Sequence, residues 1–175
     1  MTSARPPSSA YRILGLDPGL RFTGWGFIES IDNRLRFLDA GRIAIPENMA
    51  LAERLAFLHN ELQTLLNALQ PDEAAVEETF SNVNAKSTLK LGMARGVVLL
   101  APALLNIRVG EYAANTIKKT VVGAGHADKT QVQHMVKMLL PQARFDSPDA
   151  ADALAIAICH AHHIQTARNL RTILR

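Results

Sequence analysis

The segment 147–157, SPDAADALAIA, constrains the fold of this chain more than any other stretch. Ser147 is a natural helix N-cap, and Pro148 suits the first helical position, where a missing N–H costs nothing. The residues after them are almost all apolar, which predicts a helix buried in the protein core. Asp149 and Asp152 nevertheless lie three residues apart in the first turn, so they share one face. The sequence therefore predicts a core helix that begins with two neighbouring carboxylates.

These two aspartates have a structural explanation as well as a functional one. A helix N-terminus stabilises a negative charge by about 0.3–1 kcal/mol, so on the structural explanation they only complement the helix dipole. On the functional explanation they form part of a cation site, together with acidic residues from elsewhere in the chain. The choice between the two depends on where the other acidic residues lie.

The order of predicted strands and helices indicates an α/β fold. Three segments rich in strand formers and joined by short turns predict an antiparallel meander at 11–17, 23–30 and 34–45. Helical and strand patterns then alternate: helices are expected at 48–70, 84–105, 113–121, 128–140 and from 147, and strands at 73–80 and 107–112. We expect a mixed five-stranded sheet, with three antiparallel strands followed by parallel strands, and helices on both faces.

The length of 175 residues fits one compact domain. We expect it to span residues 11–166, after a disordered N-terminal extension (1–10) and before a basic C-terminal tail (167–175). The single cysteine, Cys159, excludes an intramolecular disulfide and indicates a reducing compartment, so we expect a cytoplasmic protein. Charges or prolines interrupt every apolar run before it reaches about 18 residues, which predicts no membrane span.

Positive charge is concentrated in the middle of the chain. The net charge is only +3, but residues 80–145 contain nine Lys and Arg against two acidic residues. Such a segment suits a polyanion such as nucleic acid. A solvated basic face without a partner is an equally good explanation of the charge alone.

Further acidic residues lie where apolar strands are expected to end. Asp17 ends the first strand, and Glu77 and Glu78 lie near the end of the strand at 73–80. Ligand-binding crevices of open α/β sheets lie outside the carboxyl ends of strands. If these two strands are adjacent and parallel, Asp17 and Glu77 emerge at the same edge.

Carboxylates gathered at one edge raise one another's pKa unless a cation compensates them. Mg²⁺ prefers carboxylate oxygens and keeps positions open for water and phosphate. The pattern therefore favours a divalent metal site over acids with a purely structural role.

Seven blocks of sequence, in this order, resemble the RuvC-type Holliday-junction resolvases: ILGLDPG, AVEETF, LKLGMARG, EYAA, IKKTVVG, QVQHMV and DAADALAIA. The similarity runs from about Arg12 to about His163. Members of this family of crossover junction endodeoxyribonucleases have an RNase H-like fold and act as homodimers. They cut two opposed strands of a four-way DNA junction with Mg²⁺ or Mn²⁺. The resemblance implies the same activity in recombination and repair, a four-way junction as substrate and a branch-migration helicase complex as a partner.

By position, the resemblance implies that Asp17, Glu77, Asp149 and Asp152 are the catalytic metal ligands. Strand alternation sends Glu78 to the face opposite Glu77, so only one of the two should point into the site. Some relatives have histidine where Asp149 stands. Two Mg²⁺ ions per subunit, about 3.5–4 Å apart, would align a water and neutralise phosphate oxygens, and Mn²⁺ is expected to substitute for them. The expected products carry a 5′-phosphate and a 3′-hydroxyl.

The resemblance also implies DNA contacts. Lys118 and Lys129 are expected to contact phosphates near the cleaved strand, and Phe80 to stack on an unpaired base at the junction centre. The alternatives are solvated surface lysines and a core phenylalanine. The remaining expected DNA contacts are Lys119, Lys86 and Lys90.

The resemblance also implies a dimer interface on the long helix at 84–105, because dimers of the family associate through this region. Gly92 and Gly96 lie four residues apart, with Met93 between them, and small residues at this spacing let another helix come close. Packing against the protein's own sheet is the alternative. The histidines near the C-terminus, His160, His162 and His163, fit charge compensation at a helix C-terminus better than a metal site.

Three other functions are compatible with parts of the sequence. The stretch LGLDPGLRFTGWG resembles the first phosphate loop of actin-like nucleotide-binding proteins, but those proteins need two duplicated domains. An RNase H-like nuclease that acts on RNA or RNA–DNA hybrids is closer, and the basic blocks disfavour it. A module that binds junctions without cutting them is disfavoured by the intact acidic set, because bare carboxylates repel phosphate.

Overall fold

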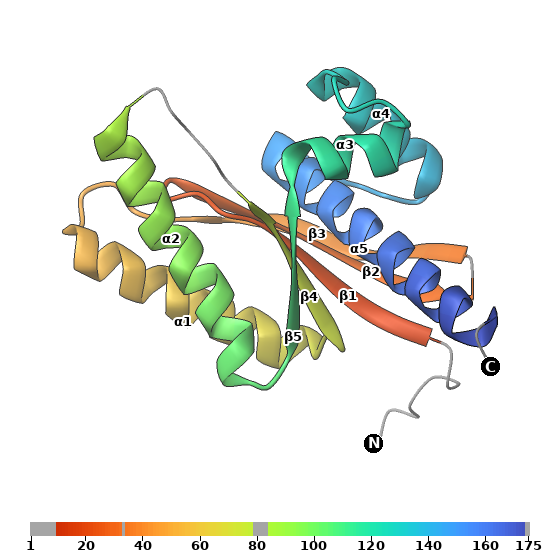
Figure 1. The fold of residues 1–175 in the computed structure, drawn as a ribbon. Helices are drawn as coiled ribbons and strands as arrows, with labels where there is room; N and C mark the ends of the chain where they lie inside the picture. Colours follow the sequence, from red (N-terminus) through yellow and green to blue (C-terminus); the bar gives the residue numbers. More distant parts are fainter. Residues whose placement is uncertain (1–9, 33, 79–83, 174–175) are drawn as a thin grey trace.

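The centre of the protein is a five-stranded sheet with the strand order β3-β2-β1-β4-β5 (Figure 1). The structure is a computed structural model, and it describes residues 10–32, 34–78 and 84–173. The strands are β1 (Ala10–Asp17), β2 (Phe22–Ile31), β3 (Arg34–Ala44), β4 (Glu73–Glu78) and β5 (Arg108–Ala113). The first three pair antiparallel, whereas β4 pairs parallel to both β1 and β5. The predicted mixed sheet is confirmed.

Helices cover both faces of the sheet (Figure 1). One face packs against α1 (Leu51–Leu69) and α2 (Ala85–Leu104), and the other against α5 (Pro148–Ile173), beside which lie α3 (Ala114–Val122) and α4 (Lys129–Leu139). Strand alternation separates two cores: Ile13 and Ala75 pack towards α5, whereas Leu14 and Val76 pack towards α1 and α2. The position of a residue along its strand therefore tells which of the two cores its side chain faces.

Helix α5 lies unusually close to the sheet. A side chain at Gly15 would meet the Ala153 carbonyl oxygen at 2.1 Å, and one at Gly24 would meet the Asp149 carbonyl oxygen at the same distance. The small residues of α5 are fully buried on the helix side of this contact. Glycine opposite alanine thus lets the helix backbone rest directly on β1 and β2. This contact fixes the first turn of α5 over the strand ends.

The C-terminal end of the described chain is helical. Helix α5 continues to Ile173, so it includes residues 167–173, which the sequence assigns to a basic tail. No proline or glycine occurs between residues 158 and 173, so the chain carries no signal that would stop the helix earlier. At the other end, β1 begins at Ala10.

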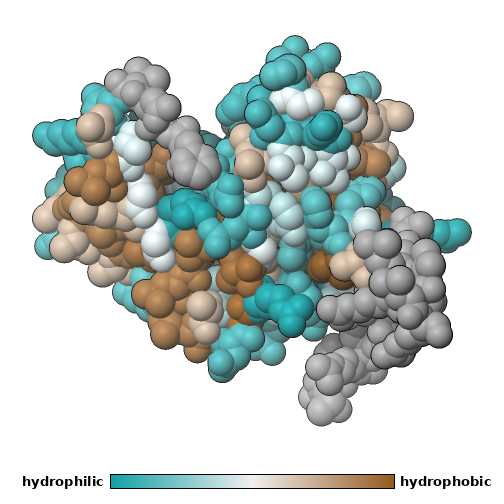
Figure 2. All heavy atoms as spheres, in the orientation of Figure 1, coloured by the Kyte–Doolittle hydropathy of each residue, from teal (hydrophilic) through white to brown (hydrophobic). Residues whose placement is uncertain are grey.

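Helix α2 carries exposed apolar side chains along its length. Among the described helices, it alone is long and apolar enough for a membrane span, a composition that helices of soluble proteins also reach, and 22% of that stretch is buried. Pro102 lies inside its last turn rather than ending it. Figure 2 shows hydrophobic surface on this side of the molecule. Its large exposed side chains include Leu89, Met93, Leu100 and Leu104.

Candidate active site at the strand ends

The two acidic strand ends lie side by side. Strands β1 and β4 are parallel and pair Leu16 with Val76, so Asp17 and Glu77 follow at the next position of each strand. Because Ala75 packs towards α5, alternation turns Glu77 to the α5 side and Glu78 to the opposite side. The arrangement expected from the order of strands is the one the structure contains.

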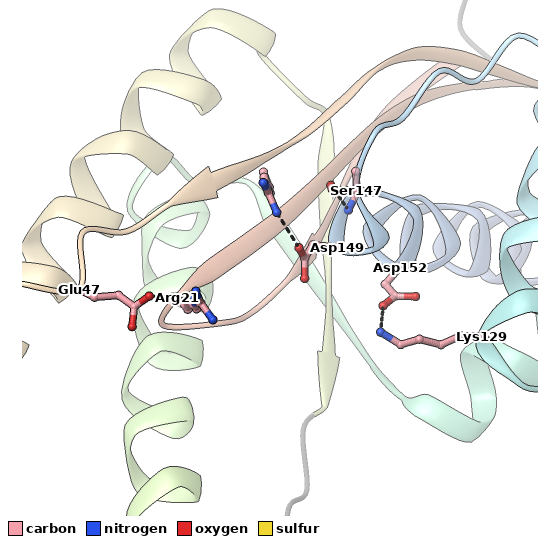
Figure 3. Close-up of polar contacts among 8 residues, drawn as sticks. Arg21, Glu47, Lys129, Ser147, Asp149 and Asp152 are labelled. Carbon is pink, nitrogen blue, oxygen red and sulfur yellow. Dashed lines mark hydrogen bonds and ion pairs between the residues drawn. The ribbon is translucent and has the colours of Figure 1, made fainter.

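The first turn of α5 begins as the sequence predicts. The Ala150 backbone N–H donates to the Ser147 side-chain oxygen over 3.2 Å, which is an N-cap bond. This cap fixes the turn that carries Asp149 and Asp152. Figure 3 shows both aspartates at this end of the helix, close to the sheet.

The pKa values show that the four carboxylates share one electrostatic environment. The pKa of Asp17 is raised to about 8, mainly by burial and then by the charges of Asp152, Glu77 and Asp149, while Lys129 opposes them. Burial also raises the pKa of Glu77, and the charge of Asp152 adds to this effect. A carboxyl held so far above its ordinary pKa is a strong candidate for a functional group. The acidic residues of β1, β4 and α5 therefore interact electrostatically at this edge of the sheet.

Two basic side chains lie beside the helix aspartates. Lys129 Nζ, at the start of α4, is 3.1 Å from Asp152 Oδ2 (Figure 3). This hydrogen bond and the charge of Asp152 raise the pKa of Lys129. Arg42 Nη1, on β3, is 3.9 Å from Asp149 Oδ2. Each aspartate thus lies beside a different basic side chain.

The donor set fits a hard divalent cation, although the side chains are not closed around one. Across the described ranges, no three His, Cys, Asp or Glu side chains are grouped closely enough to hold a metal ion. The four candidate ligands are all carboxylates, which are the donors that Mg²⁺ and Mn²⁺ prefer. Asp152 is paired with Lys129 and Asp149 lies near Arg42, while burial and the neighbouring carboxylates hold the pKa of Asp17 high.

The expected DNA contacts fall into two groups. Lys118 and Lys129 border the acidic set, since both lower the pKa of Glu77 by their charge. Lys119 is exposed on α3, and Lys86 and Lys90 are exposed near the start of α2. Phe80 lies outside the described residues.

The expected interface residues are accessible. Gly92, Met93 and Gly96 are exposed on α2, and a side chain added at either glycine would meet nothing within 4 Å. Packing of these glycines against the protein's own sheet, the alternative considered above, is wrong.

Sequence reasoning misread the histidines of α5. His160 is buried in the middle of the helix, where Nε2 is 2.9 Å from Glu73 Oε2 and Nδ1 is 2.7 Å from the Tyr112 hydroxyl. Charge compensation at a helix C-terminus is therefore wrong for His160, because the helix ends thirteen residues later at Ile173. Burial raises the pKa of Tyr112 to about 12, so its hydroxyl stays protonated. The network ties α5 to β4 and β5.

Sequence reasoning also missed Arg42. The available signal was the strand register: Asp17 pairs with Gly24, and Gly24 pairs with Arg42, so all three lie in one row across the sheet. A lone arginine on a strand carries no such information before the register is known.

Comparisons with known proteins agree on one family. Residues 13–160 match the family model described as crossover junction endodeoxyribonuclease RuvC. The protein of that name from Rhodopseudomonas palustris (strain BisA53) is 57% identical over 97% of this chain and 98% of its own length. The one from Nitrobacter hamburgensis is 60% identical over 89% of this chain and 92% of its own.

Solved structures agree as well. Thermus thermophilus RuvC in complex with Holliday junction substrate superposes with a TM-score of 0.82 at 29% identity, over 90% of this chain and 96% of that one. The yeast mitochondrial Holliday junction resolvase Ydc2 has a TM-score of 0.68 over 94% of this chain and 85% of its own, and at 14% identity it supports the fold alone.

Proposed function

The chain belongs to the RuvC family of crossover junction endodeoxyribonucleases, and we propose that it cuts four-way DNA junctions with divalent ions held by Asp17, Glu77, Asp149 and Asp152. As a member of this family it is a nuclease that resolves Holliday junctions. The observation that carries the proposed site is the shared electrostatic environment of acids from β1, β4 and α5. The products proposed are a 5′-phosphate and a 3′-hydroxyl from paired, symmetric nicks.

The metal chemistry follows from the ligand set. When bound, two Mg²⁺ ions per subunit, or Mn²⁺ in their place, supply positive charge to the phosphate oxygens and lower the pKa of an attacking water. Asp17 lies at the end of β1, where burial and the neighbouring carboxylates raise its pKa, so we assign it as the residue that would be the central metal ligand. Glu77 and the two helix aspartates complete the set.

The basic residues beside the acids position the DNA. Lys118 and Lys129 neutralise carboxylates in the free protein. Once divalent ions take over that role, both ammonium groups are available to phosphates of the cleaved strand. Replacing either lysine by alanine should reduce the slope of log affinity against log salt by about one. Phe80 as a stacking residue, and Lys119, Lys86 and Lys90 as outer contacts, remain part of the proposal.

The proposed assembly is a homodimer through α2. The exposed side chains of Leu89, Met93, Leu100 and Leu104 form an apolar stripe, and Gly92 and Gly96 leave room for a second helix beside it. Burying this stripe against a copy of itself removes apolar area from water. Two-fold symmetry also matches a junction with two equivalent strands. A branch-migration helicase complex remains the proposed partner, and the cytoplasm the proposed location.

A cleavage assay tests the function directly. A labelled four-way junction, a linear duplex and an RNA–DNA hybrid are each incubated with the protein, with and without Mg²⁺. We expect Mg²⁺-dependent cleavage of the junction alone, and we expect Asp17→Asn to abolish it while junction binding stays close to normal. Asp39→Asn, an exposed aspartate on β3, is the matched control. Preferential cutting of the hybrid would instead indicate an RNase H-like activity, and binding without cutting would indicate a junction-binding module.

A further inference from the structure

Arg42 lies in the same row of the sheet as the central catalytic acid. Its register partner on β2 is Gly24, whose own partner on β1 is Asp17. Register partners point to the same face, so Arg42 faces α5 two strands, or roughly 10 Å, from Asp17. Gly24 between them has no side chain, and the backbone of Asp149 occupies that space. The acids therefore have Lys129 on the α4 side and Arg42 on the β3 side.

The guanidinium of Arg42 is held by an aromatic ring. Its Cζ lies 4.3 Å from the centroid of the Phe22 ring, and Cζ of Arg21 lies 5.3 Å from the same centroid. Stacking on a ring fixes the plane of a guanidinium and leaves its N–H edge available. The side chain of Arg42 is 45% exposed. Phe22 thus presents a charged, oriented donor group to solvent beside the catalytic acids.

The donors of Arg42 are only weakly engaged. Its contact with Asp149 spans 3.9 Å, which is an ion pair longer than a hydrogen bond. Arg21 differs, since its Nε is 2.8 Å from Glu47 Oε1. When a divalent ion neutralises Asp149, the attraction that holds Arg42 towards that carboxylate falls. A guanidinium with five donors then lies beside the cleavage site without a strong partner among the described residues.

We propose that Arg42 contacts a DNA phosphate on the β3 side of the acidic set, so that the cleaved strand is held between Arg42 and the pair Lys118 and Lys129. The inference rests on the proposed function, because the anion at this position is the nucleic-acid backbone that the nuclease binds. Planar guanidinium donors match the oxygens of a phosphate, which is the common use of arginine at such sites. The other role open to Arg42 is to neutralise Asp149 in the free protein and nothing more.

The salt dependence of junction binding distinguishes the two roles. Affinity of the full chain for a fluorescent four-way junction is measured over a series of KCl concentrations, without divalent ions and again with Ca²⁺. Loss of one phosphate contact reduces the slope of log affinity against log salt by about 0.9. We expect this reduction for Arg42→Ala in Ca²⁺, whereas Arg42→Lys keeps the slope because it keeps the charge. An unchanged slope for Arg42→Ala in Ca²⁺ would overturn the proposal.

Controls separate this result from a folding defect and from failure of the proposed function. Arg34→Ala removes an exposed arginine at the far end of the same strand, roughly 27 Å away at about 3.4 Å per residue, and should leave the slope unchanged. The melting temperature of Arg42→Ala should stay close to that of the wild-type protein, because the lost ion pair is long and the contact with Phe22 lies at a half-exposed site. If the wild-type protein shows no preference for the junction over a duplex, the proposed function fails. If it shows the preference and Arg42→Ala behaves like Arg34→Ala, only the role of Arg42 fails.

Discussion

Asp17→Asn should change the pH dependence of folding as well as cleavage. In the metal-free protein, burial and three neighbouring carboxylates hold the pKa of Asp17 at about 8, against an ordinary value near 3.9 in an unfolded chain. Between these two values the folded state binds a proton that the unfolded state does not. The contribution of Asp17 to stability is therefore fully present below pH 4 and is lost as the pH rises towards 8.

The size of the effect follows from the two pKa values. Each pH unit between them costs about 1.4 kcal/mol of unfolding free energy, so wild type should lose about 3–4 kcal/mol from this group between pH 5 and pH 8. Asparagine has no proton to lose in this range. The difference in unfolding free energy between Asp17→Asn and wild type should thus grow by the same amount over these three pH units.

Urea unfolding in EDTA at pH 5, 6.5 and 8, followed by circular dichroism, measures this difference. Taking the difference cancels the titration of groups common to both proteins, and any fixed cost of burying an amide shifts one curve without changing its slope. At pH 8, added Mg²⁺ should stabilise wild type and leave Asp17→Asn nearly unchanged, because a ligand that binds only the folded state adds to its stability. Parallel pH curves for the two proteins would refute the reasoning, since Asp17 would then titrate normally in the fold.

Three further changes test the packing around the site and the proposed dimer face on α2. Gly24→Ala places a methyl group about 2 Å from the Asp149 carbonyl oxygen, so it should destabilise the fold by about 1–3 kcal/mol in urea unfolding and depress cleavage. Tyr112→Phe removes the hydroxyl from the buried His160 ring and should cost about 1–3 kcal/mol by the same measurement, with an unchanged value arguing that water replaces it. Leu100→Glu, on an exposed position of α2, should give a monomeric mass in light scattering without lowering monomer stability, and a persistent dimer would place the interface elsewhere.

Much of the fold and of the acidic set could be predicted from local signals. An apolar strand that ends in Asp17, and another that ends near Glu77, are visible as short runs, and parallel pairing of their strands brings the two together. The N-cap at Ser147 is equally local. These features could be predicted because each depends on residues close in sequence and on one rule, namely that ligand sites of α/β sheets lie outside the carboxyl ends of the strands.

The missed features depend on distant pairs. His160 and Glu73 are 87 positions apart, and His160 and Tyr112 are 48 apart, so their network exists only once α5 has packed on β4 and β5. The contact of Arg42 with Asp149 likewise requires the register of β3 on β2 and the position of α5. No short motif encodes such contacts, because each partner alone is an ordinary surface or core residue.

The small residues of α5 explain why aspartate, a short side chain, can serve at this site. The separation between packed elements is set by the side chains at the contact. Here Gly15 and Gly24 face the helix backbone with no side chain between, so the first turn of α5 comes down onto β1 and β2. The charges of Asp149 and Asp152 can then reach Asp17 from the α5 side of the sheet, and they raise its pKa. The glycines that allow close packing of α5 on the sheet therefore also bring the helix aspartates within range of Asp17. A bulkier residue at Gly24 would lift the helix and the two ligands together.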